Sequence, residues 1–254
     1  LYTVSPPVMS RGAEREAARA IKDAIAAGGA PEAVSAGQIS LVGAGPGARD
    51  LLTLRAVERL QEADVIFYDR LVDEAVLELA RRDAERVFVG KHVGAHAWPQ
   101  DRINRMIVAE AARGRRVVRL KSGDPGIFGR AGEESDAARA AGIPIEVVPG
   151  VTAASAAGAS LGRSLTERGV ANTLVLATGT GRADDPQPDA TRLSGPGTTT
   201  ALYMSVGQAA RLASDWMARG MPAGCPVVIC VDVSKASERL GSAPVGTLAA
   251  EMSA

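Results

Sequence analysis

Three glycine-rich loops, each directly after an apolar segment, constrain the fold of this chain more than any other feature. They are Val42-Gly43-Ala44-Gly45-Pro46-Gly47, Leu120-Lys121-Ser122-Gly123-Asp124-Pro125 and Val148-Pro149-Gly150-Val151-Thr152. Glycine has no Cβ, so its backbone can approach another backbone or a ligand closely. Three such loops at the ends of predicted strands therefore indicate one mouth of a sheet, where a ligand meets the backbone.

Around these loops, apolar runs alternate with helical patterns. Strand-like segments lie at 39–43, 64–68, 86–89, 116–120 and 145–148, and helix-like segments at about 51–62, 72–81, 99–113 and 130–141. Pro99 suits the first turn of the third helix, and Gly114 suits its end. The βαβα order predicts an α/β fold with a mostly parallel sheet and helices on both faces.

The sequence changes character at a run of small residues, 152–158. Beyond it lie strand-like segments at 172–178, 199–204 and 226–231, a Pro- and Asp-rich loop at 183–197 and a helix at about 207–219. We expect an N-terminal helix or linker at 1–37, with an amphipathic helix from 11 to 27. An N-terminal α/β domain at 38–160 and a smaller mixed α/β domain at 161–254 would follow, with a ligand between them.

The composition argues against several classes of partner. Lys plus Arg and Asp plus Glu are both 29, so no global basic field attracts nucleic acid. No stretch approaches the roughly 20 apolar residues of a membrane span, and the N-terminus lacks a secretory signal, so a cytoplasmic protein is expected. Cys225 and Cys230 are expected to be reduced thiols, and His92 and His96 cannot form a zinc site alone.

The first loop also bears on nicotinamide dinucleotide binding. Such a loop reads G-x-G-x-x-G, with an acidic residue about 20 positions later at the next strand end. Asp69 does lie at the second predicted strand end, but Pro46 and the early Gly47 replace that spacing. Proline also lacks the N–H that a pyrophosphate would bind. The loop therefore disfavours, without excluding, dinucleotide binding.

Longer motifs make the chain recognisable. They are Leu41-Val42-Gly43-Ala44-Gly45-Pro46-Gly47, Asp50-Leu51-Leu52-Thr53-Leu54, Ala63-Asp64-Val65-Ile66-Phe67-Tyr68-Asp69-Arg70-Leu71-Val72, Gly90-Lys91, Val117-Val118-Arg119-Leu120-Lys121-Ser122-Gly123-Asp124-Pro125, Phe128-Gly129-Arg130-Ala131-Gly132-Glu133-Glu134 and Val147-Val148-Pro149-Gly150-Val151-Thr152-Ala153-Ala154. In these motifs the sequence strongly resembles the uroporphyrinogen-III C-methyltransferases of the tetrapyrrole methylase superfamily. The resemblance is colinear over roughly residues 38 to 250.

The resemblance implies a two-domain α/β methyltransferase that binds S-adenosylmethionine between its domains and works as a homodimer. It implies methylation of uroporphyrinogen III at C2 and C7, giving precorrin-2 by way of precorrin-1, for sirohaem, cobalamin or haem d1 synthesis. A sulfonium methyl is already electrophilic, so the protein mainly has to align it with an electron-rich pyrrole carbon and manage protons. No metal is expected.

The family's donor-binding positions fall on several of these motifs. The family's G-G-D loop is Ser122-Gly123-Asp124 here, and it would hold the amino-acid part of the donor through the Gly123 backbone and the Asp124 carboxylate. The other donor contacts that the resemblance implies are Pro46, Ile127, Thr152, Ala153 and Met204, the last through the match of Leu202-Tyr203-Met204 to the family's Y-M motif.

Two residues match the family's proton-transfer positions, Asp69 as proton acceptor and Lys91 as proton donor. Judged without the family, Asp69 could cap a helix after a strand and Lys91 could be a solvated surface lysine. The chain has His92 after Gly90-Lys91 where the family has arginine. His92 is therefore expected at a substrate-binding position whose charge depends on pH.

The carboxylates of the substrate need cationic partners. Local basic clusters supply them, and most are expected to be solvated: Arg102, Arg105, Arg113, Arg115, Arg116, Arg119 and Lys121. We favour Arg130 as the substrate ligand, because it opens a helix beside the donor loop and a guanidinium binds carboxylate in bidentate fashion. The alternative for Arg130 is an ion pair with Glu133 or Glu134.

Departures from the family pattern leave other functions open. Ser122 replaces a glycine, Glu167 replaces a histidine, a donor-contact glycine is lost at Val233, and the family continues beyond Ala254 to a last apolar strand of the second-domain sheet. One alternative is a sister methyltransferase acting on a later precorrin. The other is a catalytically weak tetrapyrrole- or donor-binding module of a larger sirohaem synthase.

Overall fold

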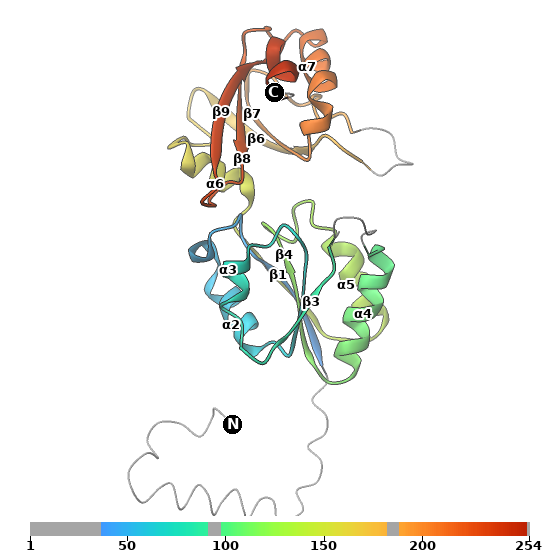
Figure 1. Ribbon diagram of the computed structural model, residues 1–254. Helices are drawn as coiled ribbons and strands as arrows, with labels where there is room; N and C mark the ends of the chain where they lie inside the picture. The colour runs from blue at the N-terminus through green and yellow to red at the C-terminus, as the bar shows by residue number, and fades with distance from the viewer. Residues whose placement is uncertain (1–36, 91–97, 182–187, 253–254) are drawn as a thin grey trace, which may run out of the picture.

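The computed structural model describes residues 37–90, 98–181 and 188–252. The helix expected at 11–27, Lys91 and His92 lie outside these ranges. The N-terminal part is a five-stranded parallel sheet in the order β3-β2-β4-β1-β5 (Figure 1). Its strands are β1 (Gln38–Gly43), β2 (Val65–Tyr68), β3 (Glu85–Phe88), β4 (Arg116–Lys121) and β5 (Ile145–Val148).

Helices cover both faces of this sheet, as its βαβα order predicts. One face carries α2 (Leu54–Glu62) and α3 (Glu74–Leu77), after the short 3₁₀ turn η2 (Arg49–Leu51). The other face carries α4 (Gln100–Ala112) and α5 (Ala131–Ala140) (Figure 1). Pro99 is the N-cap of α4, and Gly114 follows its end with φ +83°, as expected for these residue types.

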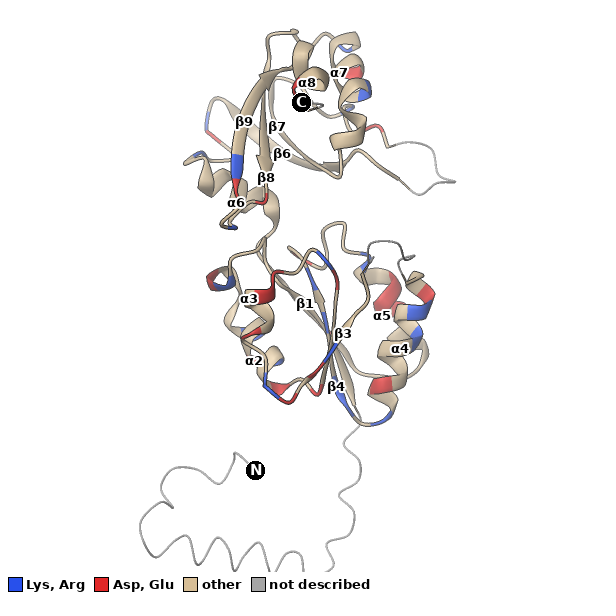
Figure 2. Ribbon diagram, in the orientation of Figure 1, with Lys and Arg blue, Asp and Glu red and all other residues tan. Residues whose placement is uncertain are grey.

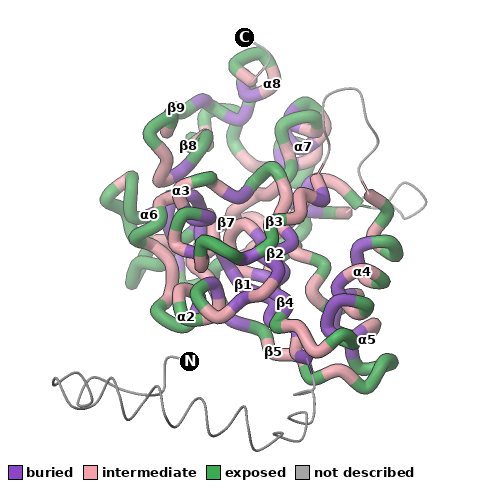
Figure 3. The backbone as a smooth tube through the Cα atoms, turned by 60° about the horizontal axis from the view of Figure 1, so that its bottom comes forward, coloured by how far each residue is buried: buried purple, intermediate pink, exposed green. Residues whose placement is uncertain are grey.

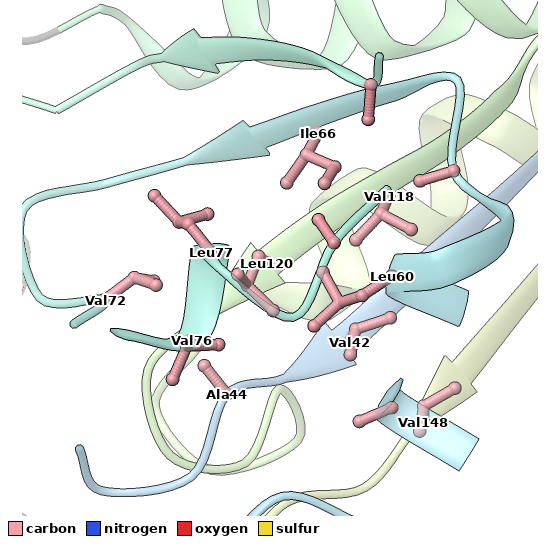
Figure 4. Close-up of a cluster of buried hydrophobic side chains, with 14 residues drawn as sticks. Val42, Ala44, Leu60, Ile66, Val72, Val76, Leu77, Val118, Leu120 and Val148 are labelled. Carbon is pink, nitrogen blue, oxygen red and sulfur yellow. The ribbon is translucent and has the colours of Figure 1, made fainter. Parts of the chain in front are cut away.

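Alternation along each strand explains why both faces are apolar. On β1, Ile39 and Leu41 pack against α4 with Ile107, whereas Val42 packs against α2 with Leu60. Successive strand side chains point to opposite faces, so a strand covered on both sides reads as a continuous apolar run. Figure 4 shows the α2–α3 side of this core, where Val42, Val118 and Leu120 of the sheet meet the helices.

The strand order places a ligand-binding position at the carboxyl ends of β1 and β4. These strands are neighbours, but the chain leaves β1 through α2 towards β2 and leaves β4 through α5 towards β5, on the opposite face. Open α/β sheets commonly bind ligands at the carboxyl ends of two such strands, where the connections turn to opposite faces of the sheet.

The helix α6 (Ala153–Ser160) directly follows the β5 loop and leads into the C-terminal part. The elements of the C-terminal part are β6 (Ala171–Thr178), β7 (Gly197–Tyr203), η3 (Val206–Gln208), α7 (Ala209–Ala218), β8 (Pro226–Val231), β9 (Arg239–Pro244), η4 (Val245–Thr247) and α8 (Leu248–Glu251). The strands pair as parallel β6-β7 and antiparallel β8-β9. Leu212 and Trp216 of α7 form a separate core with Val245 and Leu248.

The strands of the two parts differ in how far they are buried. The central strands β1, β2 and β4 of the N-terminal sheet are largely buried, whereas β8 has only intermediate and exposed residues and β9 is exposed except at Ala243 (Figure 3). None of the helices in the described ranges is long and apolar enough to cross a membrane.

Several elements differ from the sequence-based expectation. The helix expected at 72–81 is only α3, because Leu79 and Ala80 continue the chain with i→i−3 hydrogen bonds instead of an α-helix. The helices α6 and α8 and the strand β9 were not predicted. The α6 sequence contains only Ala, Ser and Gly, so it has no apolar stripe to reveal a helix, and the Gly241 and Pro244 of β9 are poor strand formers.

Candidate active site

The loops after β1 and β4 are bonded directly to each other. The Gly45 N–H donates to the Gly123 carbonyl at 3.2 Å, and the Gly123 N–H donates to the Gly45 carbonyl at 2.7 Å. Both glycines have positive φ, +67° and +70°, which glycine adopts without steric cost. The pair therefore fixes the relative position of two of the glycine-rich loops.

The third loop packs against the same pair through glycine. A Cβ on Gly150 would lie 2.2 Å from the Gly123 carbonyl oxygen, and one on Gly43 would lie 2.7 Å from the Gly150 Cα. A Cβ on Gly123, in contrast, would meet no heavy atom within 4 Å. The backbone of Gly123 thus borders open space while its neighbours are in tight contact.

Asp124 braces this arrangement. Its Oδ1 accepts the Gly126 N–H at 2.7 Å and its Oδ2 accepts the Gly150 N–H at 3.1 Å. Each carboxylate oxygen can accept more than one hydrogen bond, so both retain acceptor capacity. Asp124, in the loop after β4, therefore links that loop to the loop after β5, and backbone N–H donors fix the orientation of its carboxylate.

The other predicted donor contacts of the N-terminal part lie in these loops. Pro46 is buried beside Gly45, and the Ile127 N–H donates to the Asp124 carbonyl at 3.1 Å. Ser122 is not among the described residues with positive φ, so its backbone conformation is open to serine as well as to glycine.

Predicted donor contacts from the two parts of the chain come together at Tyr203. Thr152 and Ala153 lie at the start of α6, and Met204 follows β7 with φ +51° and an exposed side chain. The Tyr203 hydroxyl lies 2.7 Å from Thr152 Oγ1 and accepts the Ala154 N–H at 3.0 Å. The sequence analysis did not assign Tyr203 a role, although it quoted the residue in the Y-M motif.

A second contact joins the loop after β1 to the turn between β8 and β9. The Ala48 N–H donates to Ser234 Oγ at 3.1 Å, and the Lys235 side chain packs over Gly47, where a Cβ would lie 2.5 Å from Lys235 Cγ. Val233, at the position of the lost family glycine, is buried in this turn. The C-terminal part thus contacts the glycine-rich loops after β1 and β5.

Beside the loops, a buried charge network leads to Asp69. The Arg119 Nη2 donates to Asp69 Oδ2 at 3.0 Å, and its Nε donates to Glu134 Oε1 at 3.2 Å. Lys121 Nζ donates to both Glu134 oxygens, at 2.9 and 2.8 Å. The Leu71 N–H donates to Asp69 Oδ1 at 3.1 Å, so both Asp69 oxygens are held. Figure 2 marks basic residues along β4 and acidic residues on α5.

This network corrects one expectation. Arg119 and Lys121 were expected on solvated faces, but they are 4% and 5% exposed, and Glu134 is fully buried. Arg119 and Lys121 are two residues apart on β4, so both side chains point to the face of the sheet that α5 covers. On that face both are paired with Glu134. Burial lowers the pKa of Lys121, the Arg119 charge lowers it further, and Glu134 partly offsets both.

Arg130 lies apart from the network, at the N-cap of α5 with φ +57°. Its Nε and Nη2 donate to the two oxygens of Glu133 at 2.8 and 2.7 Å, and this hydrogen bonding raises the pKa of Arg130 despite partial burial. Of the two ion-pair alternatives for Arg130, the structure contains the pair with Glu133, whereas Glu134 belongs to the network. The Arg130 side chain is 52% exposed, so it remains accessible to a ligand.

Metal-ligand geometry is not found in the described part of the chain. No group of three or more His, Cys, Asp or Glu residues there could hold a metal ion, and Cys225 and Cys230 are free thiols.

The fold and this site define an α/β protein in which loops at the carboxyl ends of a parallel sheet meet a facing C-terminal part. The family model of tetrapyrrole (corrin/porphyrin) methylases matches residues 38–249. The chain therefore belongs to the tetrapyrrole methylase family.

Known relatives agree with this membership. A siroheme synthase of Pseudomonas aeruginosa is 46% identical over 232 residues, which are 90% of this chain and 49% of the relative. The chain spans about half the length of the curated relatives it matches. The uroporphyrin-III C-methyltransferase of Thermus thermophilus complexed with S-adenosylhomocysteine is a similar solved structure, with a TM-score of 0.73 and 36% identity over 85% of this chain and 86% of that one. A cobalt precorrin-4 methyltransferase has a TM-score of 0.74 at 26% identity, over 88% of this chain and 92% of that one.

Proposed function

We propose that this chain transfers methyl groups from S-adenosylmethionine to uroporphyrinogen III at C2 and C7, giving precorrin-2 by way of precorrin-1. Membership of the methylase family supports methyl transfer, and the similar Thermus thermophilus structures favour this substrate over a later precorrin. The observation that carries the proposal is the convergence of three glycine-rich loops beside the held carboxylate of Asp69.

The residues at the mouth fit the methyl donor. Gly123 presents its backbone to open space, and Asp124 keeps acceptor capacity for the donor's ammonium group. The remaining contacts that we propose are Pro46, Ser122, Ile127, Thr152, Ala153 and Met204. When bound, the donor supplies an electrophilic methyl group on a sulfonium. The chain has to orient that group and exclude water from it.

Proton management would fall to Asp69. The carbon that accepts the methyl group already carries a side chain and has no hydrogen, so methylation leaves a positive charge on the pyrrole. A proton must then leave from a ring nitrogen or a bridging carbon, and a carboxylate within reach can accept it. Arg119 and the Leu71 N–H hold the Asp69 oxygens in one orientation, which is the arrangement that a positioned base needs. We assign Lys91 as the proton donor, and Arg130 and His92 as partners of the substrate carboxylates.

Two broader properties belong to the same proposal. We infer a cytoplasmic protein that acts as a homodimer, as the family resemblance implies. We also keep one alternative, that the chain serves as the methyltransferase module of a larger siroheme synthase, because its curated relatives are about twice its length.

The direct test is an anaerobic incubation of the protein with S-adenosylmethionine and enzymatically made uroporphyrinogen III. We expect a product that carries two added methyl groups by mass spectrometry and has the chromophore of precorrin-2. Donor binding without any methylated product would favour a catalytically weak binding module. Turnover only of a later precorrin would favour a sister methyltransferase.

Asp69→Asn tests the proton acceptor. The amide oxygen can still accept from Arg119, so the fold should persist, while turnover should fall about 100-fold or more because the amide cannot take the proton. Saturation with both substrates separates turnover from binding, and the melting temperature checks the fold. Full turnover by the variant under these conditions would remove Asp69 from the mechanism.

A further inference from the structure

Tyr203 holds together several groups that the proposed function assigns to the donor. It is the last residue of β7, at the end of the C-terminal part that faces the glycine-rich loops. Its hydroxyl bonds the Thr152 side chain and the Ala154 N–H at the start of α6. Its ring lies against Phe128, with centroids 5.1 Å apart and planes inclined at 49°. One side chain thus contacts both the loop after β4 and the helix after β5.

The backbone of Tyr203 is fixed as firmly as its hydroxyl. Its carbonyl accepts the Gly179 N–H at 3.0 Å and the Ser205 hydroxyl at 2.7 Å. Met204 lies between Tyr203 and Ser205 and adopts φ +51°. This conformation costs energy for a residue with a Cβ and persists only where the surroundings impose it. The Met204 side chain is 58% exposed as a result, and it does not pack into the C-terminal core.

Phe128 shows the same kind of constraint on the other side of the contact. It has φ +52°, follows Ile127 directly, and its ring is 40% exposed despite the contact with Tyr203. Backbones in sparsely populated conformations on both sides of one aromatic contact indicate that the site is held in a single arrangement before a ligand arrives.

We propose that Tyr203 is a positioning residue for the methyl donor: its hydroxyl orients Thr152 and the start of α6, and its anchored backbone presents Met204. This inference rests on the proposed function, since it takes Thr152, Ala153 and Met204 as donor contacts. Tyr203 acts through these groups, so its loss weakens donor binding by disordering them, with no change in the chemistry of the methyl transfer.

The conservative variant Tyr203→Phe removes only the hydroxyl and keeps the ring against Phe128. We expect the Kd for S-adenosylhomocysteine, measured by calorimetry, to rise about 10-fold, because Thr152 and the Ala154 N–H lose their partner. The KM for S-adenosylmethionine should rise by a similar factor while the KM for uroporphyrinogen III stays within about two-fold.

Ser160→Ala provides the matched control. It removes another hydrogen bond that joins α6 to the C-terminal part, from Ser160 Oγ to Glu238 Oε2 at 2.9 Å, but at the far end of the helix. A general loosening of the contact between the two parts would weaken donor binding in both variants. Positioning by Tyr203 predicts that Ser160→Ala binds the donor analogue like the wild type.

A double-variant cycle with Thr152→Val separates positioning from independent effects. Valine keeps the branched shape of threonine, so this variant also serves if Tyr203→Phe proves unstable. If Tyr203 acts through Thr152, the double variant should be no more than about three-fold weaker than the weaker single variant. The inference would be overturned if the rise in Kd of the double variant equalled the product of the rises in the two single variants. An unchanged Kd in Tyr203→Phe or in Thr152→Val would overturn it as well. Absence of binding to the wild type would overturn the proposed function, and this inference with it.

Discussion

At the scale of single residues, the Glu134 carboxylate has the most demanding environment in the described structure. It is fully buried, and its partners are Lys121 at both oxygens, Arg119 at one, and the Gln100 side-chain amide at 3.1 Å. Burying a charge is costly unless it is paired and hydrogen-bonded, and here the two cations depend on the same carboxylate. Glu134 therefore supports the arginine that holds Asp69.

Replacement of Glu134 by glutamine should destabilise the fold by about 3 to 5 kcal/mol, because it removes the counter-ion of buried Lys121 and leaves buried Arg119 paired with Asp69 alone. Urea unfolding at pH 7 measures the loss. Asp136→Asn is the control, since it breaks an exposed ion pair with Arg139 on the same helix and should change little. A Glu134→Gln variant as stable as the control would show that the network does not contribute to stability.

Two glycines of the mouth should respond differently to alanine. Gly150→Ala should cost about 3 kcal/mol, because its Cβ would collide with the Gly123 carbonyl, which belongs to a bonded backbone pair. Gly123→Ala meets no atom and should cost only about 1 kcal/mol for its positive φ.

The two glycine variants also separate folding from binding. The methyl of Gly123→Ala would fill the open space assigned to the donor, so the folded variant should bind S-adenosylhomocysteine more weakly. Thermal unfolding and calorimetry on the same samples check both parts. Wild-type affinity in Gly123→Ala would place the donor away from this backbone.

Among the secondary-structure elements, Asp64 links the beginnings of three strands. It lies at the amino-terminal end of the sheet, opposite the candidate site. Its side chain accepts the Arg116 N–H at the start of β4 at 2.7 Å and the Arg81 guanidinium at 3.0 Å, and its carbonyl accepts the Glu85 N–H at the start of β3. Burial raises the pKa of Asp64, but these hydrogen bonds outweigh it and the net pKa is lowered. The ionised carboxyl thus helps to fix where β2, β3 and β4 begin.

Asp64→Asn should lower the free energy of unfolding at pH 7 by about 1 kcal/mol. A depressed pKa in the folded state stabilises the fold above the ordinary carboxyl range near pH ~4, and this advantage is lost as pH falls through the lowered pKa. The difference between wild type and variant should therefore shrink as the pH falls below about 4. Urea titrations across that range test this, and a difference independent of pH would contradict it.

At the scale of the whole molecule, the contacts of Tyr203, Ser234 and Lys235 attach the C-terminal part to the mouth of the N-terminal sheet. A donor held by groups from both parts should stabilise their joint folding. The division at residues 160 and 161 remains a prediction, and α6 shows why a single boundary is hard to assign: it continues the β5 loop yet is bonded to Tyr203 and Glu238.

S-adenosylhomocysteine at 100 times its Kd should therefore add about 2.7 kcal/mol to the stability of the folded state. For a folded region of this size, the melting temperature should rise by roughly 5 to 10 °C. Homocysteine alone at the same concentration is the control and should give no shift. A donor analogue that binds by calorimetry but raises no melting temperature would mean that it also binds the unfolded chain.

Local sequence patterns were sufficient to locate the strands of the N-terminal sheet and the glycine-rich loops that follow them, because apolar runs and glycine reflect local backbone requirements. The predicted segment 145–148 coincides with β5 for that reason, and 226–231 coincides with β8 in the C-terminal part. The burial of Arg119 and Lys121 against Glu134, and the contact of Tyr203 with Thr152, depend instead on how distant segments pack. Those pairings join residues distant in the chain, and nothing in a local pattern distinguishes a lysine that will meet a buried carboxylate from one that will face water.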